Sequence, residues 1–196
     1  MNKKLFQSIR EYKRESILAP VFVILEVLME VLIPLQMAKI IDIGIQDGNL
    51  PYIIKMGFIL VIMAMLALVF GAKAGNYAAI AGAGYAQNLR HDIFYKVQEF
   101  SFKNIDHFST SSLVTRMTTD ITNVQMAYMM SIRLLARAPI MIVLSWIMTL
   151  TINVKIALLF LIVIPLLGGT LIFISKKAHP HFIKVFDEYD VLNNGV

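Results

Sequence analysis

Four long apolar stretches constrain this chain more than any other feature. The clearest are residues 56–72, which contain no charged residue, and residues 156–175. About 20 helical residues at 1.5 Å each are enough to cross the ~30 Å hydrocarbon core of a bilayer. Only 16% of the residues are charged and 58% are hydrophobic, whereas a soluble domain has roughly 25% charged residues. The sequence therefore predicts an all-α polytopic membrane protein.

The layout of the spans follows from where the apolar stretches begin and end. We predict spans over about residues 17–41, 52–86, 126–150 and 156–175. A basic start precedes the first stretch, as it does in a signal peptide. That stretch is longer than the roughly 7–15 residues of a signal-peptide core, it contains Glu26 and Glu30, and no small-residue cleavage site follows it. We therefore interpret it as a span.

The distribution of Lys and Arg orients these spans. Residues 1–16, 87–137 and 176–196 hold five, six and three of the 18 basic residues. Cytoplasmic loops near spans carry an excess of Lys and Arg. We therefore expect a multi-pass protein of the cell (plasma or inner) membrane with both termini in the cytoplasm. Residues 2–15 predict an amphipathic elbow helix in the headgroup region, with a solvated basic tail as the alternative.

Past the second span, the helical period persists while polarity rises. Apolar residues recur at Leu89, Ile93, Val97 and Phe100. This spacing predicts that the helix leaves the membrane without a break and projects ~25 Å into the cytosol. Within the span, Ala74, Ala78 and Gly82 form a stripe of small residues that allows another helix to approach closely.

Glu26 and Glu30 are two carboxylates one helical turn apart near the middle of the first span. A charge there costs about 3 kcal/mol or more, and it marks a transport pathway or a paired partner. One interpretation places both in a substrate cavity, where they would favour cationic substrates. The other pairs them structurally with Lys73, Arg133 or Arg137. Apart from such pairing, we interpret Arg133 and Arg137 as anchors at the membrane interface.

The polar segment between the two halves carries the most specific motif. It reads Asn104-Ile-Asp-His-Phe-Ser-Thr-Ser-Ser-Leu-Val-Thr-Arg-Met-Thr-Thr-Asp-Ile-Thr-Asn-Val-Gln125. This motif resembles the first intracellular loop of ATP-binding cassette (ABC) exporters, in the form found in bacterial multidrug-type exporters that are often heterodimeric. Residues 34–42, 164–166 and 184–194 are similar to other parts of the family's helices. The resemblance covers essentially the whole chain.

The resemblance implies the N-terminal part of a type I exporter transmembrane domain, with four of its six helices, long cytosolic extensions and a first intracellular loop over about residues 100–125. In the family, a short coupling helix of this loop seats in a groove of a nucleotide-binding domain. The matching residues are Ile105, Asp106, His107, Phe108, Ser109, Thr110, Ser111 and Ser112. Phe108 would be the apolar anchor. Arg116 and Asp120, four residues apart, form a candidate pair on the helix that follows the loop.

The implied function is the permease part of an ATP-driven exporter of amphiphilic, drug-like or lipid-like substrates. ATP and Mg²⁺ would bind nucleotide-binding domains outside this chain, and a second transmembrane subunit would complete a homo- or heterodimer. The sequence has no phosphate-binding G-x-x-x-x-G-K-[ST] motif and no metal-binding H-E-x-x-H motif, so we expect no catalysis, cofactor or metal in the chain itself. The net charge of +5 is explained by topology, so no nucleic-acid partner is expected.

Two other function classes compete with this interpretation. A self-contained four-span protein, such as a channel or an assembly factor, would have the same hydropathy pattern. An intramembrane enzyme would need a nucleophile and base or a metal cluster within its spans, and the sequence shows none. Near the end of the chain, Phe182, Val185, Phe186 and Tyr189 form an apolar face that nothing later in the sequence covers. This pattern leads us to expect a truncated or interrupted product that is inactive in transport alone.

Overall fold

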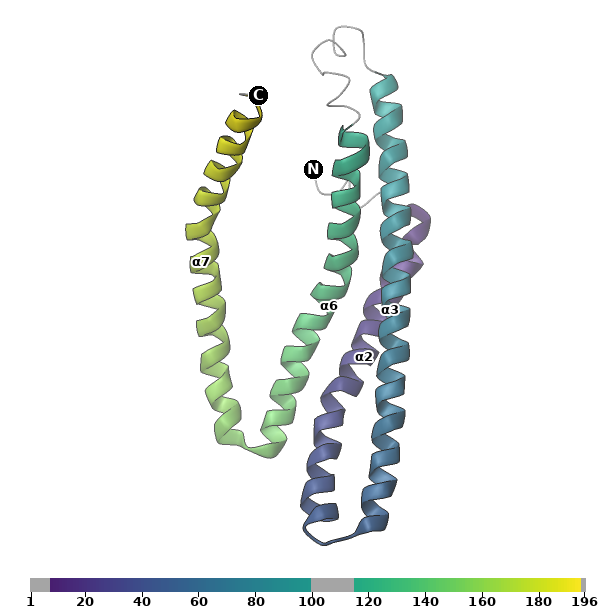
Figure 1. Ribbon diagram of the computed structural model, residues 1–196, viewed down its shortest axis with the longest axis vertical. Helices are drawn as coiled ribbons and strands as arrows, with labels where there is room; N and C mark the ends of the chain where they lie inside the picture. Colours follow the sequence, from purple (N-terminus) through teal and green to yellow (C-terminus); the bar gives the residue numbers. More distant parts are fainter. Residues whose placement is uncertain (1–7, 100–114, 195–196) are drawn as a thin grey trace. The chain divides into compact units, whose positions relative to one another are not determined.

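The computed structural model describes residues 8–99 and 115–194, with side chains as far as residue 178 except that of Arg116. In chain order, the elements are η1 (Arg10–Tyr12), α2 (Lys13–Lys39), η2 (Ile40–Ile45), α3 (Leu50–Gln98), η3 (Arg116–Asp120), α6 (Ile121–Ile152) and α7 (Val154–Asn194). Of these, η1 is a 3₁₀ turn, and η2 and η3 are π-helical. Every described element is helical, as Figure 1 shows. The predicted all-α fold class is therefore confirmed for the described residues.

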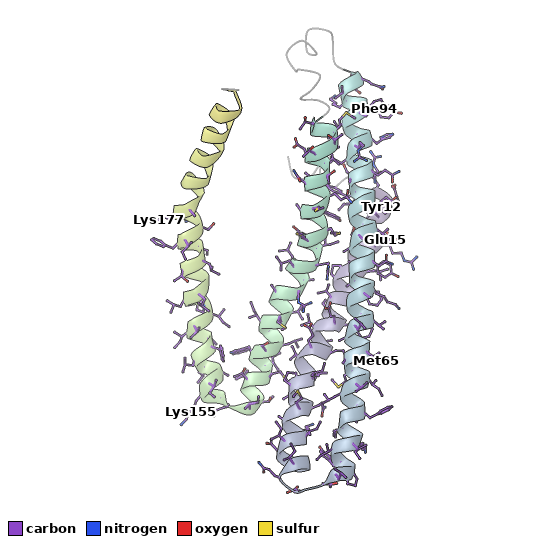
Figure 2. All side chains as sticks on the ribbon, viewed as in Figure 1. Tyr12, Glu15, Met65, Phe94, Lys155 and Lys177 are labelled. Atoms are coloured by element: carbon purple, nitrogen blue, oxygen red, sulfur yellow. The ribbon has the colours of Figure 1, made fainter. Side chains whose placement is uncertain are left out.

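Four helical segments of the described chain are long and apolar enough to cross a membrane. They are Arg10–Ile45, Leu50–Gln98, Met117–Ile152 and Val154–Ala178. Their apolar side chains are largely exposed: Leu68 is 72% and Leu135 75% accessible. Figure 2 labels two more exposed apolar side chains on α3, Met65 and Phe94. Exposing so much contiguous apolar surface to water would be unfavourable, whereas lipid tails are as apolar as these side chains. The chain is a multi-pass membrane protein.

The turn between α2 and α3 is confined to residues 46–49, because α2 continues through η2 as far as Ile45. Gly48 has a φ of 63°, a left-handed conformation that costs glycine little. The side chain of Asn49 accepts a hydrogen bond from the backbone N–H of Tyr52 at 3.1 Å and so caps α3. Pro51 lies in the first turn of α3. Backbone N–H groups in a first turn have no acceptor within the helix, so the N–H that proline lacks is not needed there.

The helix α3 is much longer than a membrane is thick. Its 49 residues correspond to about 74 Å at 1.5 Å per residue, against a hydrocarbon core of ~30 Å. The helix runs without a break through residues 87–98, which agrees with the helical period predicted there. At least one end of α3 must therefore project well beyond the bilayer core.

The structure divides into two compact units, residues 1–144 and residues 145–196. In the first unit, Val23, Val27 and Ala74 form a buried core cluster, and the side chains that pack against it are Phe22, Val31, Ala136, Ile140 and Leu144. Ala74 and Ala78 are completely buried, so the predicted small-residue stripe lies at the helix contacts. Small side chains on α3 thus allow α2 and the first part of α6 to pack closely.

The second unit contains the end of α6 and all of α7, joined at Asn153. The Asn153 side chain accepts hydrogen bonds from the backbone N–H groups of Lys155 (2.9 Å) and Ile156 (3.3 Å). The side-chain oxygen of Asn153 therefore caps the N-terminus of α7. The indole N–H of Trp146 donates to the carbonyl oxygen of Ala157 at 3.1 Å. These bonds close the α6–α7 hairpin at the turn beside the Lys155 label of Figure 2.

Candidate functional site

Both carboxylates of α2 converge on one guanidinium of α6. Nη1 of Arg137 donates to Oε1 of Glu26 at 2.9 Å. Nη2 of Arg137 lies 2.7 Å from each carboxylate oxygen of Glu30. We call Glu26, Glu30 and Arg137 the ion cluster. It connects residues that are 107 to 111 positions apart in the sequence.

Local sequence explains how the ion cluster is assembled. Glu26 and Glu30 are four residues apart, so they lie on one face of α2. A Cβ atom at Gly71 of α3 would lie 3.1 Å from the Glu26 carboxylate, so glycine there leaves room for that side chain. The core residues Ala136 and Ile140, on either side of Arg137, hold α6 against α2 and α3.

The charges of the ion cluster are only partly balanced. Three of the four carboxylate oxygens accept from Arg137, while Oε2 of Glu26 is buried and has no hydrogen-bond partner in the described part of the chain. The side chain of Glu26 is 14% exposed, that of Glu30 33% and that of Arg137 37%. Partly desolvated pairs of this kind interact more strongly than pairs in open water. Of the two interpretations of Glu26 and Glu30 drawn from the sequence, this arrangement is the structural pairing with a basic residue.

Other predicted partners of the carboxylates lie elsewhere. The ammonium group of Lys73 lies over the ring of Phe22, 5.4 Å from its centroid. Arg133 makes no ion pair with a described residue. Arg137 itself is a member of the ion cluster, and its role as an anchor at the membrane interface stays a prediction. A contact of Glu26 or Glu30 with a substrate stays a prediction.

The coupling residues Ile105–Ser112 lie outside the described residues, so their predicted role stays a prediction. The candidate pair of Arg116 and Asp120 stays a prediction too, because the side chain of Arg116 lies outside the described residues. The side chain of Asp120 is exposed. Beside the loop, Nε of Arg90 on α3 donates to the carbonyl oxygen of Met117 at 3.3 Å. This bond links the two helices that flank the loop.

The N-terminal segment docks on α3 through contacts that the sequence analysis missed. The hydroxyl of Ser8 donates to Asp92 at 2.9 Å, and the guanidinium of Arg10 pairs with the same carboxylate. The side-chain amide of Asn88 donates to the Ser8 carbonyl oxygen at 3.0 Å. The ring of Tyr12 occupies the space that a side chain at residue 84 would need, which Gly84 leaves free. We call Ser8, Arg10 and Tyr12 the N-terminal clasp.

The clasp also departs from the predicted elbow helix over residues 2–15. Six of its 14 residues lie outside the described part of the chain. Among the other eight, Ser8 and Ile9 form a turn, Arg10–Tyr12 form the 3₁₀ turn η1 with a positive φ of 41° at Arg10, and α2 begins at Lys13. The spacing of Asn88 and Asp92 could have indicated the docking surface, because polar residues four positions apart lie on one face of the α3 extension.

A second polar contact joins α2, α3 and α6 near the clasp. The rings of Tyr85 and Tyr128 stack with centroids 4.5 Å apart. The hydroxyl groups of Tyr128 and Ser16 lie 2.8 Å apart, within hydrogen-bond distance. Gly82 is also part of this contact, because a Cβ atom there would lie 3.2 Å from Cβ of Met129. Buried tyrosine rings with a bonded hydroxyl are specific as well as apolar contacts.

The described residues contain no group of three His, Cys, Asp or Glu side chains placed to hold a metal ion. The ion cluster, the clasp and the tyrosine contact all join helices. Their chemistry is that of ion pairing and hydrogen bonding between helices.

Comparisons with known proteins agree with this description. A family model described as the ABC transporter transmembrane region matches residues 16–195. The Uncharacterized ABC transporter ATP-binding protein YfiB of Bacillus subtilis (strain 168) is 31% identical over 97% of this chain and 33% of its own length. The Uncharacterized ABC transporter ATP-binding protein Rv1273c of Mycobacterium tuberculosis (strain ATCC 25618 / H37Rv) is 26% identical over 96% of this chain and 32% of its own length.

A more distant relative is the ATP-dependent lipid A-core flippase of Pseudoalteromonas translucida (strain TAC 125). It is 22% identical over 89% of this chain and 30% of its own length. The chain thus spans about a third of the length of the curated relatives it matches. The family model covers nearly every residue and confirms the resemblance inferred from residues 104–125. This chain therefore belongs to the ABC transporter transmembrane region family.

Proposed function

We propose that this chain is the permease part of an ATP-driven ABC exporter that moves amphiphilic, drug-like or lipid-like substrates across the membrane. The observation that carries the proposal is α3, a single helix of 49 residues that is longer than the bilayer core and leads into the polar segment at residue 100. An unbroken helix is stiff because each turn is bonded to the next. A displacement at its polar end is therefore transmitted into the span.

The same proposal assigns the polar segment to a partner. Residues Ile105–Ser112 bind a groove of a nucleotide-binding domain, with Phe108 buried in it. An exposed aromatic side chain gains stability when a partner covers it. ATP and Mg²⁺ bind that domain, outside this chain, and this chain catalyses no reaction. The names of the relatives, which include ATP-binding proteins, support a partner of this kind.

The proposed assembly lies in the cell membrane with both termini and the coupling segment in the cytoplasm. The basic residues at 1–16, 87–137 and 176–196 support this orientation. A second transmembrane subunit completes the transport pathway. Lipid-like substrates are supported by the name of the flippase relative, and a preference for cations through Glu26 and Glu30 stays a prediction.

The test is a change at the coupling residue in the completed transporter. Phe108→Ala should lower substrate-stimulated ATP hydrolysis about tenfold or more, since truncating a buried aromatic anchor costs about 2 kcal/mol or more of binding. Phe94→Ala is a matched control, because Phe94 is an exposed aromatic residue on α3 outside the coupling segment. ATP hydrolysis and membrane insertion are measured in the same proteoliposomes.

Two results would contradict the proposal. If Phe108→Ala leaves the stimulation unchanged, residues 105–112 are a connector without a coupling role. If the 196-residue chain alone forms an ion-conducting pore in liposomes, the self-contained channel is the better interpretation. Reduced stimulation in both Phe108→Ala and Phe94→Ala would indicate a general loss of structure.

A further inference from the structure

A groove on the first unit combines an apolar wall with positive charge. Its volume is about 300 Å³, and its lining residues are Val23 of α2 and Met130, Arg133, Leu134 and Arg137 of α6. This volume is at the lower end for sites that bind small molecules. Neither Glu26 nor Glu30 lines the groove, but both bind Arg137, so Arg133 is the lining residue whose charge no described carboxylate offsets.

The two guanidinium groups of the groove differ in their partners. Arg137 already binds Glu26 and Glu30. Arg133 is exposed and has no ion pair with any described residue. The two carboxylates offset the charge of Arg137, so Arg133 is the guanidinium of the groove that favours an anion. A guanidinium matches a phosphate well, because its N–H groups can donate to two oxygens at once.

The depth of Arg133 in the span fits a lipid headgroup. The helix α6 ends at Ile152, 19 residues beyond Arg133, which corresponds to about 28 Å at 1.5 Å per residue. This length is close to the ~30 Å thickness of the hydrocarbon core. If the Asn153 turn lies at one membrane boundary, Arg133 lies near the other, at the level of the phosphate groups. The apolar wall of Val23, Met130 and Leu134 then faces acyl chains.

We propose that this groove binds an acidic glycerophospholipid, with its phosphate on Arg133 and an acyl chain along Val23, Met130 and Leu134. A zwitterionic lipid binds less well, because its own ammonium group offsets the phosphate charge that Arg133 attracts. The inference goes beyond the proposed function, because such a lipid is held by the membrane domain in the absence of ATP and transport. Its failure would leave the exporter assignment unchanged.

The test is lipid retention by the 196-residue chain in detergent, followed by native mass spectrometry. Phosphatidylglycerol and phosphatidylcholine with identical acyl chains are added separately. Arg133→Gln should lower phosphatidylglycerol affinity about tenfold, as expected for a lost charge-assisted hydrogen bond, and lower phosphatidylcholine affinity less, so that the preference between the two lipids falls. Lys155→Gln is the charge-matched control at the α6–α7 turn and should change neither. Met130→Trp fills the groove without changing its charge and should lower binding of both lipids.

The results of these measurements distinguish an acidic lipid in the groove from a free anion or from a lipid bound elsewhere. Wild-type affinity in Arg133→Gln, or equal affinity of the wild type for both lipids, would overturn the proposal. Unchanged binding in Met130→Trp would show that the lipid sits elsewhere. Competition by millimolar inorganic phosphate would identify a free anion as the occupant instead. If Arg133→Gln does not fold, Arg133→Lys replaces it, and retention of most of the phosphatidylglycerol preference is then the supporting result.

Discussion

Arg137 shows how a single side chain can connect helices that hydropathy treats as independent. Most contacts inside this chain are apolar, and apolar surface in lipid gives helices little reason to prefer one partner over another. The Arg137 guanidinium binds Glu26 and Glu30 together. It therefore determines which face of α6 contacts α2 and at what height along the helix. Removing one member leaves uncompensated charge in a poorly solvated place, which costs more than the pair contributes.

Arg137→Met should therefore destabilise the first unit. We expect a loss of about 1–3 kcal/mol, less than the ~3–5 kcal/mol typical of fully buried pairs, because the Arg137 side chain is 37% exposed. Helix loss during denaturation in mixed micelles, followed by circular dichroism, measures the effect. Arg133→Gln is the control one turn away and should have little effect. Equal stability of Arg137→Met and Arg133→Gln would mean that the ion cluster contributes nothing measurable.

Gly84 is the second residue whose replacement has a clear structural consequence. A methyl group in Gly84→Ala would overlap the Tyr12 ring and should displace the N-terminal clasp, at a cost of about 1–3 kcal/mol. Gly75→Ala is the matched control on the same helix, because nothing lies within 4 Å of the added atom. It should be neutral or stabilising by up to about 1 kcal/mol.

Limited digestion with trypsin measures the position of the clasp. Cleavage after Arg10, Lys13 and Arg14 should be several-fold faster in Gly84→Ala than in Gly75→Ala, because release of the clasp exposes the backbone to the protease. Equal cleavage rates in the two variants would argue that Tyr12 moves aside without releasing the clasp.

At the scale of elements, the ends of the helices are set by side chains in short turns. Asn49 caps α3 after a four-residue turn, and Asn153 caps α7 after a turn of one residue. Each asparagine satisfies backbone N–H groups that the first turn of a helix leaves without a partner. Such short turns force successive helices to run in opposite directions, which alternates the sides of the membrane that they reach.

Asn153→Ala should weaken the α6–α7 hairpin. Loss of the cap costs about 0.5–2 kcal/mol, while Asn153→Asp keeps an oxygen acceptor and should retain most of the stability. The fluorescence of Trp146, the single tryptophan of the chain, reports on this hairpin because its indole bonds across the turn. If Asn153→Asp is as destabilising as Asn153→Ala, the side-chain cap is not the cause.

At the scale of the whole molecule, the four spans can be tested for orientation. The chain contains no cysteine, so a single introduced cysteine is the one residue of the chain that a thiol reagent can label. Asp47→Cys and Lys155→Cys, in the two short turns, should react with an impermeant thiol reagent added outside intact cells, whereas Ser111→Cys should react only after lysis. The physical reason is the excess of Lys and Arg on the side of Ser111. Labelling of Ser111→Cys from outside would reverse the proposed topology.

The sequence by itself determined that there are four long apolar helices, the all-α class and the family. Hydropathy, helical period and capping depend on neighbours in the chain, so a linear pattern contains them. The segment at residues 104–125 identified the family because its residues are adjacent in sequence. Glu26 and Glu30 were recognised as exceptional for the same reason, since a charge inside an apolar stretch is visible locally.

Only the tertiary structure decided which partner those carboxylates have. Three basic residues were candidates, and the sequence could not choose among them, because the pairing with Arg137 joins positions more than 100 residues apart. The choice depends on how closely α6 approaches α2, and the small residues of α3 and the packing of Ala136 and Ile140 set that approach. The clasp on Asp92 and the groove at Arg133 depend on the same helix contacts. Distances between helices are a property of packing, which a linear pattern does not contain.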